Sequence, residues 1–267
     1  MALPPPDPGT TCLSTGASSG IGAEIARGLA ARGLGVTLVA RREDRLRDLA
    51  GELTEAYGVE AEVVTGDVSK ERSRKQIVAE VEQRGLTVEV LVNNAGFGSG
   101  GRFTKLDAAK EASMVRTNCE AIVALTGHYL PEMASRGRGG VLNVASLIAF
   151  QPVPLQATYG ATKAFVLSFS DALHEEMRGT GVTVCAVCPG PVRTEFGEQG
   201  GFGGADDRIP DALWLDAEKV AGDAIRALES GDRVTVPGAG NQLAALWGQH
   251  LPRSVLLPLV KRIWPVK

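Results

Sequence analysis

Cysteine and histidine are scarce in this chain. Four cysteines and three histidines occur in 267 residues, and the cysteines are too few and too scattered for a disulfide framework. Cys185 and Cys188 have C-x-x-C spacing, but they lie in the apolar run VTVCAVC, where a strand would point residues three apart to opposite faces. His128, His174 and His250 add no metal-ligand spacing. We therefore expect a reducing, cytoplasmic compartment and no metal site.

An excess of basic residues and a long apolar run are also missing. The formal net charge of -3 gives no general attraction to nucleic-acid phosphates, so we expect no nucleic-acid partner. No run approaches the roughly 18 apolar residues that span a bilayer. The start, MALPPPDPGT, lacks the cationic and apolar regions of a secretory signal, and we expect residues 1–10 to form a flexible Pro-rich arm.

What the chain does contain is a regular alternation of apolar, β-rich runs with amphipathic segments of helix length, which is typical of parallel βαβ units. We predict strands at residues 11–14, 35–40, 60–65, 88–93, 140–146, 182–187 and 233–236. Helices are predicted at residues 20–31, 42–57, 69–84, 108–136, 157–178 and 217–229. No linker interrupts this series. We therefore predict one α/β domain over 11–238, a doubly wound, Rossmann-like parallel sheet of about seven strands with helices on both faces, followed by a C-terminal extension at 239–267.

A glycine-rich turn, TGASSGIG at 15–22, follows the first predicted strand. Its three glycines can bring amide groups and the start of a helix against a diphosphate. The G-x-x-x-G-x-G spacing differs from the common G-x-G-x-x-G pattern, and by itself it fits plain turn chemistry about as well. The position after the first strand favours a dinucleotide site, because ligands of such sheets bind at the carboxyl ends of the strands.

The end of the second predicted strand, VARRED, indicates which dinucleotide binds. A fold that prefers NAD would offer a carboxylate here, whereas a guanidinium can pair with the 2'-phosphate of NADP and stack on adenine. Arg41 and Arg42 therefore predict NADP(H). Alternatively these arginines begin a charged helix face, which suits Arg42 better than Arg41.

Tyr159 and Lys163 form a candidate acid-base pair. Four residues apart in a predicted helix, they lie on one face and about 6 Å apart along the axis. An adjacent ammonium favours the phenolate of a tyrosine, whose pKa is ordinarily about 10. Ser146, at the end of the fifth predicted strand, could hydrogen-bond a substrate oxygen near the phenol. Taken alone, the Tyr-Lys spacing fits an exposed helix pair better.

Taken together, these motifs resemble the classical short-chain dehydrogenase/reductase family over residues 11–236. The matching segments are TGASSGIG at 15–22, NNAG at 93–96, Asn118, Ser146, YGATK at 159–163 and PGPVRT at 189–194. The resemblance implies an oxidoreductase that interconverts a carbonyl and an alcohol by hydride transfer. In it Tyr159 transfers the proton, Lys163 lowers the pKa of Tyr159 and holds the nicotinamide ribose, Ser146 orients the carbonyl, and Asn118 supports a water relay. Asn118 also fits a plain helix-bending polar residue.

The resemblance also implies the cofactor-binding positions. Asp67 and Val68 would flank the adenine, and Val192 and Thr194 would hold the nicotinamide carboxamide. Ser19 stands where many NADP-using relatives have a basic residue, so the NADP preference rests mainly on the first arginine after the second strand. The full set is Gly16, Ser18, Ser19, Gly20, Ile21, Gly22, Arg41, Arg42, Asp67, Val68, Asn94, Ala95, Gly96, Tyr159, Lys163, Val192 and Thr194.

Residues 195–216 are glycine-rich and are predicted to form a substrate lid. The lid contains no paired basic residues that would clamp a carboxylate or phosphate, so we expect an apolar small-molecule carbonyl or alcohol. Candidate pocket residues are Phe97, Leu147, Phe150, Val153, Phe196, Phe202 and Trp214.

The extension at 239–267 contains four basic residues and no acidic one: Arg253, Lys261, Arg262 and Lys267. With its leucines and valines it resembles an interfacial segment that contacts a membrane peripherally. A helix packed on its own subunit or on a neighbour is an equal alternative, and Pro252, Pro258 and Pro265 should keep any helix short. We expect a homodimer or homotetramer.

Two other functions remain as alternatives. One is a non-catalytic regulator that senses the NADP redox state, against which the complete set of acid-base residues argues. The other is an isomerase, epimerase or dehydratase on the same scaffold, against which the modest length of the chain argues.

Overall fold

A seven-stranded, fully parallel sheet forms the centre of the computed structural model, which describes residues 3–197 and 210–263. The strand order is β3-β2-β1-β4-β5-β6-β7. The chain therefore reverses its direction of winding between β1 and β4, and ligands of such sheets bind in the crevice outside this point. The strands are β1 (Thr10–Thr15), β2 (Val36–Ala40), β3 (Ala61–Thr65), β4 (Thr87–Asn93), β5 (Gly139–Val144), β6 (Val182–Val187) and β7 (Val234–Thr235).

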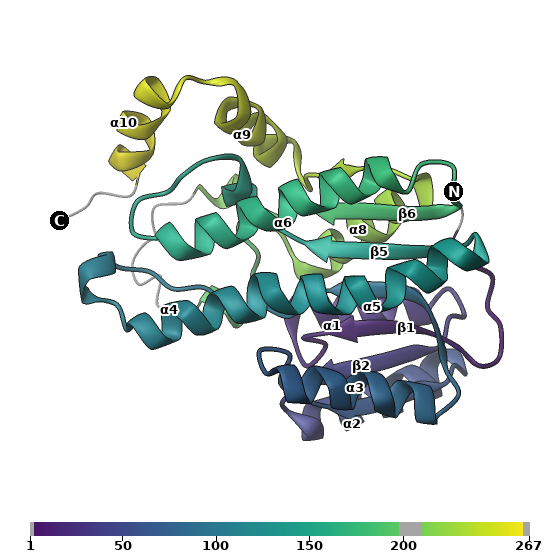
Figure 1. Ribbon diagram of the computed structural model, residues 1–267. Helices are drawn as coiled ribbons and strands as arrows, with labels where there is room; N and C mark the ends of the chain where they lie inside the picture. Colours follow the sequence, from purple (N-terminus) through teal and green to yellow (C-terminus); the bar gives the residue numbers. More distant parts are fainter. Residues whose placement is uncertain (1–2, 198–209, 264–267) are drawn as a thin grey trace.

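Helices cover both faces of the sheet, which confirms the predicted doubly wound architecture (Figure 1). One buried cluster packs α1, α2 and α8 on one face, and a second packs α3, α5 and α6 on the other. Because both faces are covered, the strands are almost continuously apolar. The helices are α1 (Gly20–Ala30), α2 (Glu43–Tyr57), α3 (Glu71–Gln83), α4 (Ala108–Val115), α5 (Ala121–Arg136), α6 (Ala157–Glu176), α8 (Ala217–Ser230), α9 (Ala239–His250) and α10 (Arg253–Ile263).

The predicted helix at 108–136 is not one regular α-helix. A π-helical turn, η2 (Arg116–Glu120), separates α4 from α5 and contains Asn118. A π turn inserts one extra residue into the helical repeat and often marks a functional site. The irregularity therefore coincides with a residue to which the family resemblance assigned a catalytic role.

Cys185 and Cys188 lie on opposite sides of the sheet, as their spacing predicts. Both are fully buried, Cys185 in the cluster below α1 and α8 and Cys188 in a smaller cluster with Val166 of α6. Burial raises the pKa of each thiol to about 12, so both remain protonated and inert at neutral pH.

The N-terminal segment lies on the body of the protein over the part that the structure describes. Leu3 packs against the first core cluster and Pro4 is buried. The amide of Thr10 donates to the carbonyl of Asp7 at 3.1 Å, directly before β1. Leu3 and Pro4 therefore contact the domain, whereas residues 5–8 are exposed, and residues 1–2 lie outside the described range.

Beyond β7 the extension folds into α9 and α10, which lie over the same end of the molecule as the start of α6 (Figure 1). Pro252 lies between the two helices and Pro258 lies inside α10, and the helices are 12 and 11 residues long, in keeping with the expectation that the prolines keep them short. Leu256 and Val260 of α10 pack on Val153, so one face of this helix contacts its own subunit. Within residues 3–197 and 210–263, no helix is both long and apolar enough to cross a membrane.

Candidate active site

The glycine-rich turn and the loop after β4 are packed against each other at the switch point of the sheet. The side-chain amide of Asn94 donates to the carbonyls of Thr15 (2.9 Å) and Gly16 (3.2 Å), and the Thr15 hydroxyl accepts from the amides of Asn94 and Ala95. Gly16 has a φ of 67°, and a Cβ atom there would lie 2.7 Å from the Asn94 amide nitrogen. A Cβ atom at Gly22 would lie 2.6 Å from the Gly16 carbonyl oxygen. Only glycine permits this close approach.

The start of α1 is suited to an anion. Its N-cap, Ser19, makes no side-chain capping hydrogen bond, and its first turn contains no acidic residue. The first amide groups of a helix lack intrahelical partners and carry partial positive charge. Gly20 has a φ of 56°, a conformation that favours glycine, and Ile21 packs against the first core cluster. The arrangement suits the diphosphate of a dinucleotide.

Thr194 closes the other side of this turn. A Cβ atom at Gly20 would lie 3.1 Å from the Thr194 methyl carbon, so the segment after β6 crosses directly over the start of α1. Val192 forms a parallel bridge with Leu215, and two main-chain hydrogen bonds of 3.0 Å join the same two segments. This bridge fixes both ends of the predicted lid. Residues 198–209 of that lid, including Phe202, lie outside the described residues.

Arg42, rather than Arg41, reaches the glycine-rich turn. Its guanidinium donates to the hydroxyls of Ser18 (3.0 and 3.2 Å) and Ser19 (2.8 Å). Arg42 is also the N-cap of α2, so its backbone begins the charged helix while its side chain turns to Ser18 and Ser19. Arg41 is exposed, and its charge acts on the carboxyl of Asp67. Burial by itself would raise the pKa of Asp67, but the hydrogen bonds from Ser69 and the charge of Arg41 together hold this pKa below its ordinary value.

Asp67 and Val68 differ in their surroundings. Asp67 lies at the end of β3 and accepts from the amide and hydroxyl of Ser69 at 3.0 and 2.7 Å. Val68 is 7% exposed and packs with Ile77 in the second core cluster, so its side chain faces the core. Of this pair, Asp67 alone presents its side chain outside the core.

Tyr159 and Ser146 meet at the carboxyl end of β5. Ser146 lies two residues beyond the end of the strand, where it caps the short helix η3 (Leu147–Phe150). Burial raises the pKa of Tyr159 to about 12, and a hydrogen bond with Ser146 lowers it in part. This direction is opposite to the lowered pKa that we expected. At neutral pH the phenol is therefore protonated.

Lys163 and Asn118 lie behind Tyr159 and are almost completely buried. The Lys163 ammonium donates to the carbonyl of Val144 at 2.7 Å and lies 5.8 Å from the centre of the Tyr159 ring. Burial lowers the pKa of Lys163 to about 8. Asn118 donates to the Phe97 carbonyl (3.0 Å) and to the Thr162 hydroxyl (3.1 Å). A Cβ atom at Gly96 would touch Asn118 at 3.0 Å and Lys163 at 3.7 Å, so Gly96 lies between them.

An apolar side chain of the lid covers the phenol. The ring of Phe196 is centred 5.7 Å from that of Tyr159, and the planes are tilted by 49°. Trp214, at the other end of the lid, packs on the guanidinium of Arg193 at 5.5 Å. Phe196 therefore lies against the ring of Tyr159, whereas Trp214 lies against Arg193 at the base of the predicted lid.

Three apolar residues that cluster with the predicted Val153 were not themselves predicted: Ile148, Leu256 and Val260. Ile148 of η3 packs with Val153 and with Leu256 and Val260 of α10. Phe150 faces α9, where a Cβ atom at Gly248 would lie 3.2 Å from its side chain. The partners of these residues are about 100 positions away in the sequence, and no local signal marks the contact. Of the other candidates, Leu147 is half-buried and its amide donates to the carbonyl of Pro189 at 2.7 Å.

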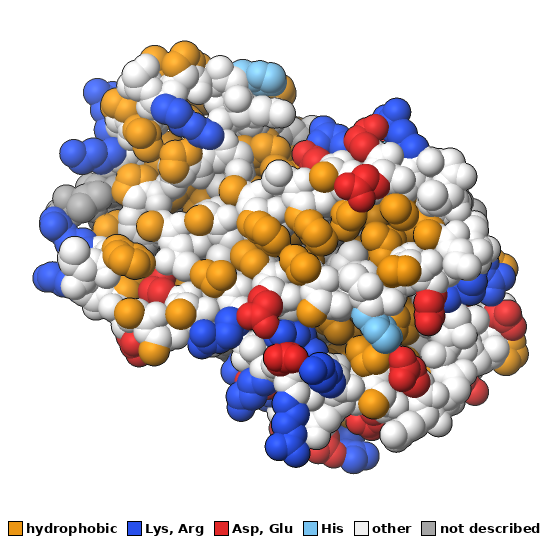
Figure 2. Space-filling model, in the orientation of Figure 1, with side chains coloured by type: hydrophobic (Ala, Val, Ile, Leu, Met, Phe, Trp, Pro, Cys, Tyr) orange, Lys and Arg blue, Asp and Glu red, His pale blue; other side chains and the backbone are white. Residues whose placement is uncertain are grey.

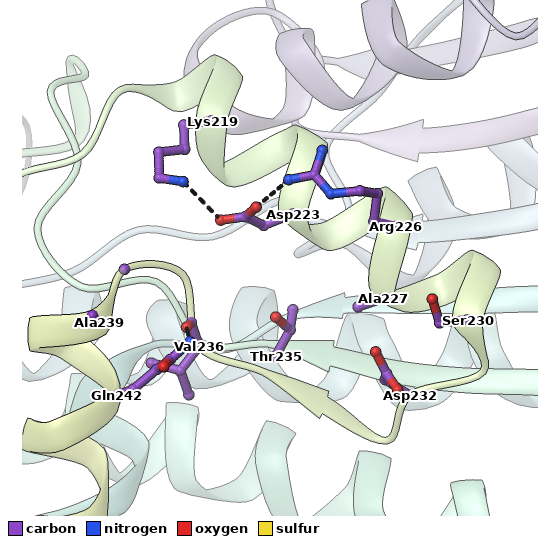
Figure 3. Close-up of a pocket in the computed structure, with 11 residues that line it drawn as sticks. Lys219, Asp223, Arg226, Ala227, Ser230, Asp232, Thr235, Val236, Ala239 and Gln242 are labelled. Carbon is purple, nitrogen blue, oxygen red and sulfur yellow. Dashed lines mark hydrogen bonds and ion pairs between the residues drawn. The ribbon is translucent and has the colours of Figure 1, made fainter.

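Two hollows lie outside the group formed by Ser146, Tyr159, Lys163 and Asn118. One, of about 250 Å³, lies beside Phe103 and Leu155, four residues before Tyr159. The other, of about 420 Å³, lies between α8 and the turn from β7 to α9, and in it Asp223 pairs with Lys219 and Arg226 (Figure 3). None of the predicted site residues lines the larger hollow, so it is separate from the candidate active site.

Comparison with known proteins identifies the fold and the reaction class. The model of the short chain dehydrogenase family matches residues 10–200. A protein of Streptomyces coelicolor with a provisional name as a ketoacyl reductase is 44% identical over 184 residues, which are 68% of this chain and 70% of that protein.

Solved structures resemble the chain over almost its whole length. A short-chain dehydrogenase from Sphingobium yanoikuyae in complex with NADPH is 32% identical, with a TM-score of 0.79 over 93% of this chain and 95% of that one. A variant of the actinorhodin polyketide ketoreductase with NADPH is 34% identical, with a TM-score of 0.76 over 88% and 97% of the two chains.

Proposed function

Because the chain belongs to the short-chain dehydrogenase family, we propose that it is an NADP(H)-dependent oxidoreductase that interconverts a carbonyl and an alcohol on an apolar small molecule. The observation that carries this proposal is the convergence of Tyr159, Ser146, Lys163 and Asn118 beside the glycine-rich turn at the carboxyl ends of β1, β4 and β5. A redox sensor without turnover would need no buried acid-base pair. The convergence therefore favours an enzyme.

Tyr159 acts as the general acid during carbonyl reduction. Its pKa of about 12 keeps the phenol protonated at neutral pH, ready to give its proton to the carbonyl oxygen. Ser146 hydrogen-bonds the phenol and can hold the same oxygen within reach. NADP(H), when bound, supplies or accepts the hydride at the carbonyl carbon. In the reverse direction Tyr159 must first lose its proton, so oxidation is favoured at higher pH.

Lys163 and Asn118 position the reacting groups. Lys163 is held by the Val144 carbonyl at the end of β5, and its charge next to the ring favours the phenolate that forms after proton transfer. Asn118 bonds both the loop after β4 and the Thr162 hydroxyl of α6. It thereby connects the cofactor side of the crevice to the helix that bears Tyr159. The π turn at 116–120 directs its amide there.

The preference for NADP over NAD rests on the corner formed by Arg42, Ser18 and Ser19. This corner lies after β2, where dinucleotide folds read the 2' position of the adenosine ribose. A guanidinium and two hydroxyls suit a 2'-phosphate, and the NADPH bound by two structural relatives agrees with this choice.

The expected substrate is apolar near its carbonyl. Phe196 covers Tyr159, and Val153, Leu256 and Val260 form an apolar cluster with Ile148 next to Ser146. The named functions of relatives include ketoacyl and polyketide ketone reduction, which also place the carbonyl on an extended carbon chain. An apolar ketone therefore fits better than a charged sugar.

The exposed face of α5 and α6 is a candidate contact between copies of the chain. Hydrophobic side chains follow these two helices across the surface (Figure 2). They include Val123 and the stacked pair Phe165 and Phe169, of which Val123 and Phe165 are 42% and 41% exposed. Exposed apolar area of this kind marks association surfaces, and a second copy presenting the same face would cover it.

A second exposed apolar surface lies on α9 and α10, opposite the face that contacts the body. Leu246, Trp247 and Leu257 are among its exposed side chains, and Arg253, Lys261 and Arg262 accompany them without any acidic residue. This combination supports peripheral contact with an anionic membrane.

The test is an assay of NADPH consumption over a panel of ketones and aldehydes of increasing apolar length, with the corresponding alcohols and NADP for the reverse reaction. We expect turnover to increase with apolar length. Tyr159→Phe keeps the buried ring and should bind NADPH normally, but its turnover should fall by about 10²- to 10⁴-fold. A Phe variant that is as active as the native enzyme would refute the assignment.

A further inference from the structure

Glu195, the first residue of the lid, forms ion pairs with two arginines on the far side of the crevice. Its carboxylate accepts from Arg42 at 3.0 Å and from Arg45 at 2.7 Å. Arg42 ends the turn after β2 and Arg45 lies in the first turn of α2. Glu195 follows β6, which is separated from β2 by β1, β4 and β5 in the sheet. The pair therefore spans the mouth of the crevice.

The guanidinium of Arg42 donates hydrogen bonds both to the glycine-rich turn and to Glu195 of the predicted lid. Its Nε and Nη2 atoms bond the hydroxyls of Ser18 and Ser19, while Nη1 bonds the carboxylate of Glu195. The hydrogen bonds from Arg45 and Arg42 hold the pKa of Glu195 below its ordinary value, so its charge is present at neutral pH. The carboxylate of Glu195 is thus bound to Arg42, the arginine that best fits a 2'-phosphate.

We infer that Glu195 is a specificity-determining residue that competes with the 2'-phosphate of NADP(H) for Arg42. The inference rests on the proposed function, because it assumes that the dinucleotide binds in this crevice. The phosphate must displace the carboxylate from Nη1 of Arg42, while Glu195 keeps its second partner, Arg45. NAD(H) has a hydroxyl at this position and leaves the ion pair intact.

The competition reduces the advantage of NADP(H) over NAD(H). A carboxylate and a phosphate repel each other when both approach one guanidinium, and an exposed ion pair must be broken before the phosphate binds. Removing the charge of Glu195 should therefore strengthen the binding of ligands that carry a 2'-phosphate and leave other ligands unchanged. Glu195 has no assigned part in the acid-base chemistry, and 40% of its side chain is exposed, so the substitution should not disturb folding.

The experiment compares the full-length native protein with Glu195→Gln by titration with NADPH, NADH, 2',5'-ADP and 5'-ADP. Gln preserves the shape of the side chain and removes its charge. We expect Glu195→Gln to bind NADPH and 2',5'-ADP about two- to fivefold more tightly, the range that an exposed ion pair supplies. NADH and 5'-ADP should bind as before. The difference should disappear at about 1 M salt, where surface charges are screened.

Glu52→Gln is the matched control. Glu52 lies in α2, as Arg45 does, and forms an exposed ion pair with Arg27 through two hydrogen bonds of 2.7 Å. This variant removes the same charge at a distance from the crevice, so it should leave all four affinities unchanged. An equal gain in Glu52→Gln would show that net charge alone causes the effect and would overturn the inference.

Two other results would also overturn it. Unchanged or weaker NADPH binding by Glu195→Gln would show that Glu195 does not compete with the phosphate, and equal tightening of NADPH and NADH would show that it acts elsewhere. If the native protein bound neither NADPH nor NADH, the proposed function would fail, and this inference with it. Native NADPH binding that is insensitive to Glu195 would refute this inference alone.

Discussion

Replacement of Gly22 by alanine should disrupt the crevice at its most crowded point. The added Cβ atom would lie 2.6 Å from the Gly16 carbonyl oxygen, and closer still to the side-chain amide of Asn94. Ordinary contact with a Cβ atom begins at about 3.4 Å, so the carbonyl must move by about 0.8 Å, the difference between 3.4 and 2.6. The same movement disturbs the hydrogen bonds of Asn94 to Thr15 and Gly16.

The size of the effect follows from these contacts. Overpacking costs about 1–3 kcal/mol, and each disturbed hydrogen bond adds about 0.5–1.5 kcal/mol. A loss of about 3 kcal/mol in the free energy of unfolding would lower Tm by roughly 6–12 °C in a domain of this size. NADPH affinity should fall as well, because the displaced groups belong to the turn that receives the diphosphate.

Gly51→Ala is the control variant, and its expected change in Tm has the opposite sign. It lies exposed in α2, and a Cβ atom there would have no atom within 4 Å. Alanine is favoured over glycine inside a helix by about 0.8–1 kcal/mol, so Gly51→Ala should raise Tm by about 2–4 °C and leave NADPH binding unchanged. Thermal unfolding and NADPH titration test both variants. If Gly22→Ala unfolded at the native Tm and bound NADPH normally, our account of the turn would be wrong.

Four further predictions concern cofactor, proton, subunit contact and tail. Arg42→Ala should weaken NADPH binding about tenfold and NADH binding little, and a larger effect of Arg41→Ala in the same titrations would show that Arg41 reads the phosphate instead. Because the pKa of Tyr159 is raised to about 12, alcohol oxidation should accelerate about tenfold per pH unit from neutral to alkaline pH, whereas reduction should not; an oxidation rate that levels off near pH 7 would contradict this. Phe165→Glu should shift the protein to smaller species in size-exclusion chromatography, unless α6 lies outside the subunit contact. Truncation after Gly240 should leave NADPH binding near normal but reduce turnover of apolar ketones and any salt-sensitive binding to anionic vesicles, and equal behaviour of both proteins would exclude a functional tail.

The order of elements could be predicted from sequence because each strand and helix has a local signal. Both sheet faces are covered, so strands such as β2 (VTLVA) and β6 (VTVCAV) appear as compact apolar runs, and most predicted ends lie within two residues of the observed ones. The prediction was wrong at 108–136, where a single π turn leaves the apolar pattern nearly unchanged. The prolines of the extension were expected to keep its helices short, and α9 and α10 are 12 and 11 residues long.

The candidate site was predictable where chemistry depends on local spacing. Gly16, Gly22 and Asn94 meet because the carboxyl ends of β1 and β4 are adjacent. The direction in which a side chain points was harder to predict from the sequence. Arg41 and Arg42 are neighbours with the same chemistry, and only the backbone path between β2 and α2 decides that Arg42 points toward Ser18 and Ser19. The raised pKa of Tyr159 likewise reflects burial by distant residues.

Part of the apolar surface proposed to receive the substrate lies outside the segment that matches the family model, residues 10–200. The bridge between Val192 and Leu215 fixes the end of the lid, and Leu256 and Val260 bring α10 against the η3 segment next to Ser146. The proposed cofactor-binding and acid-base residues all lie in the matched segment, whereas the apolar surface proposed for the substrate combines Ile148 and Val153 with residues after that segment. Substitutions at Leu256 or Val260 should therefore change which ketones are reduced without changing NADPH affinity. A search for the natural substrate should accordingly be guided by this surface, because relatives that share the chemistry need not share it.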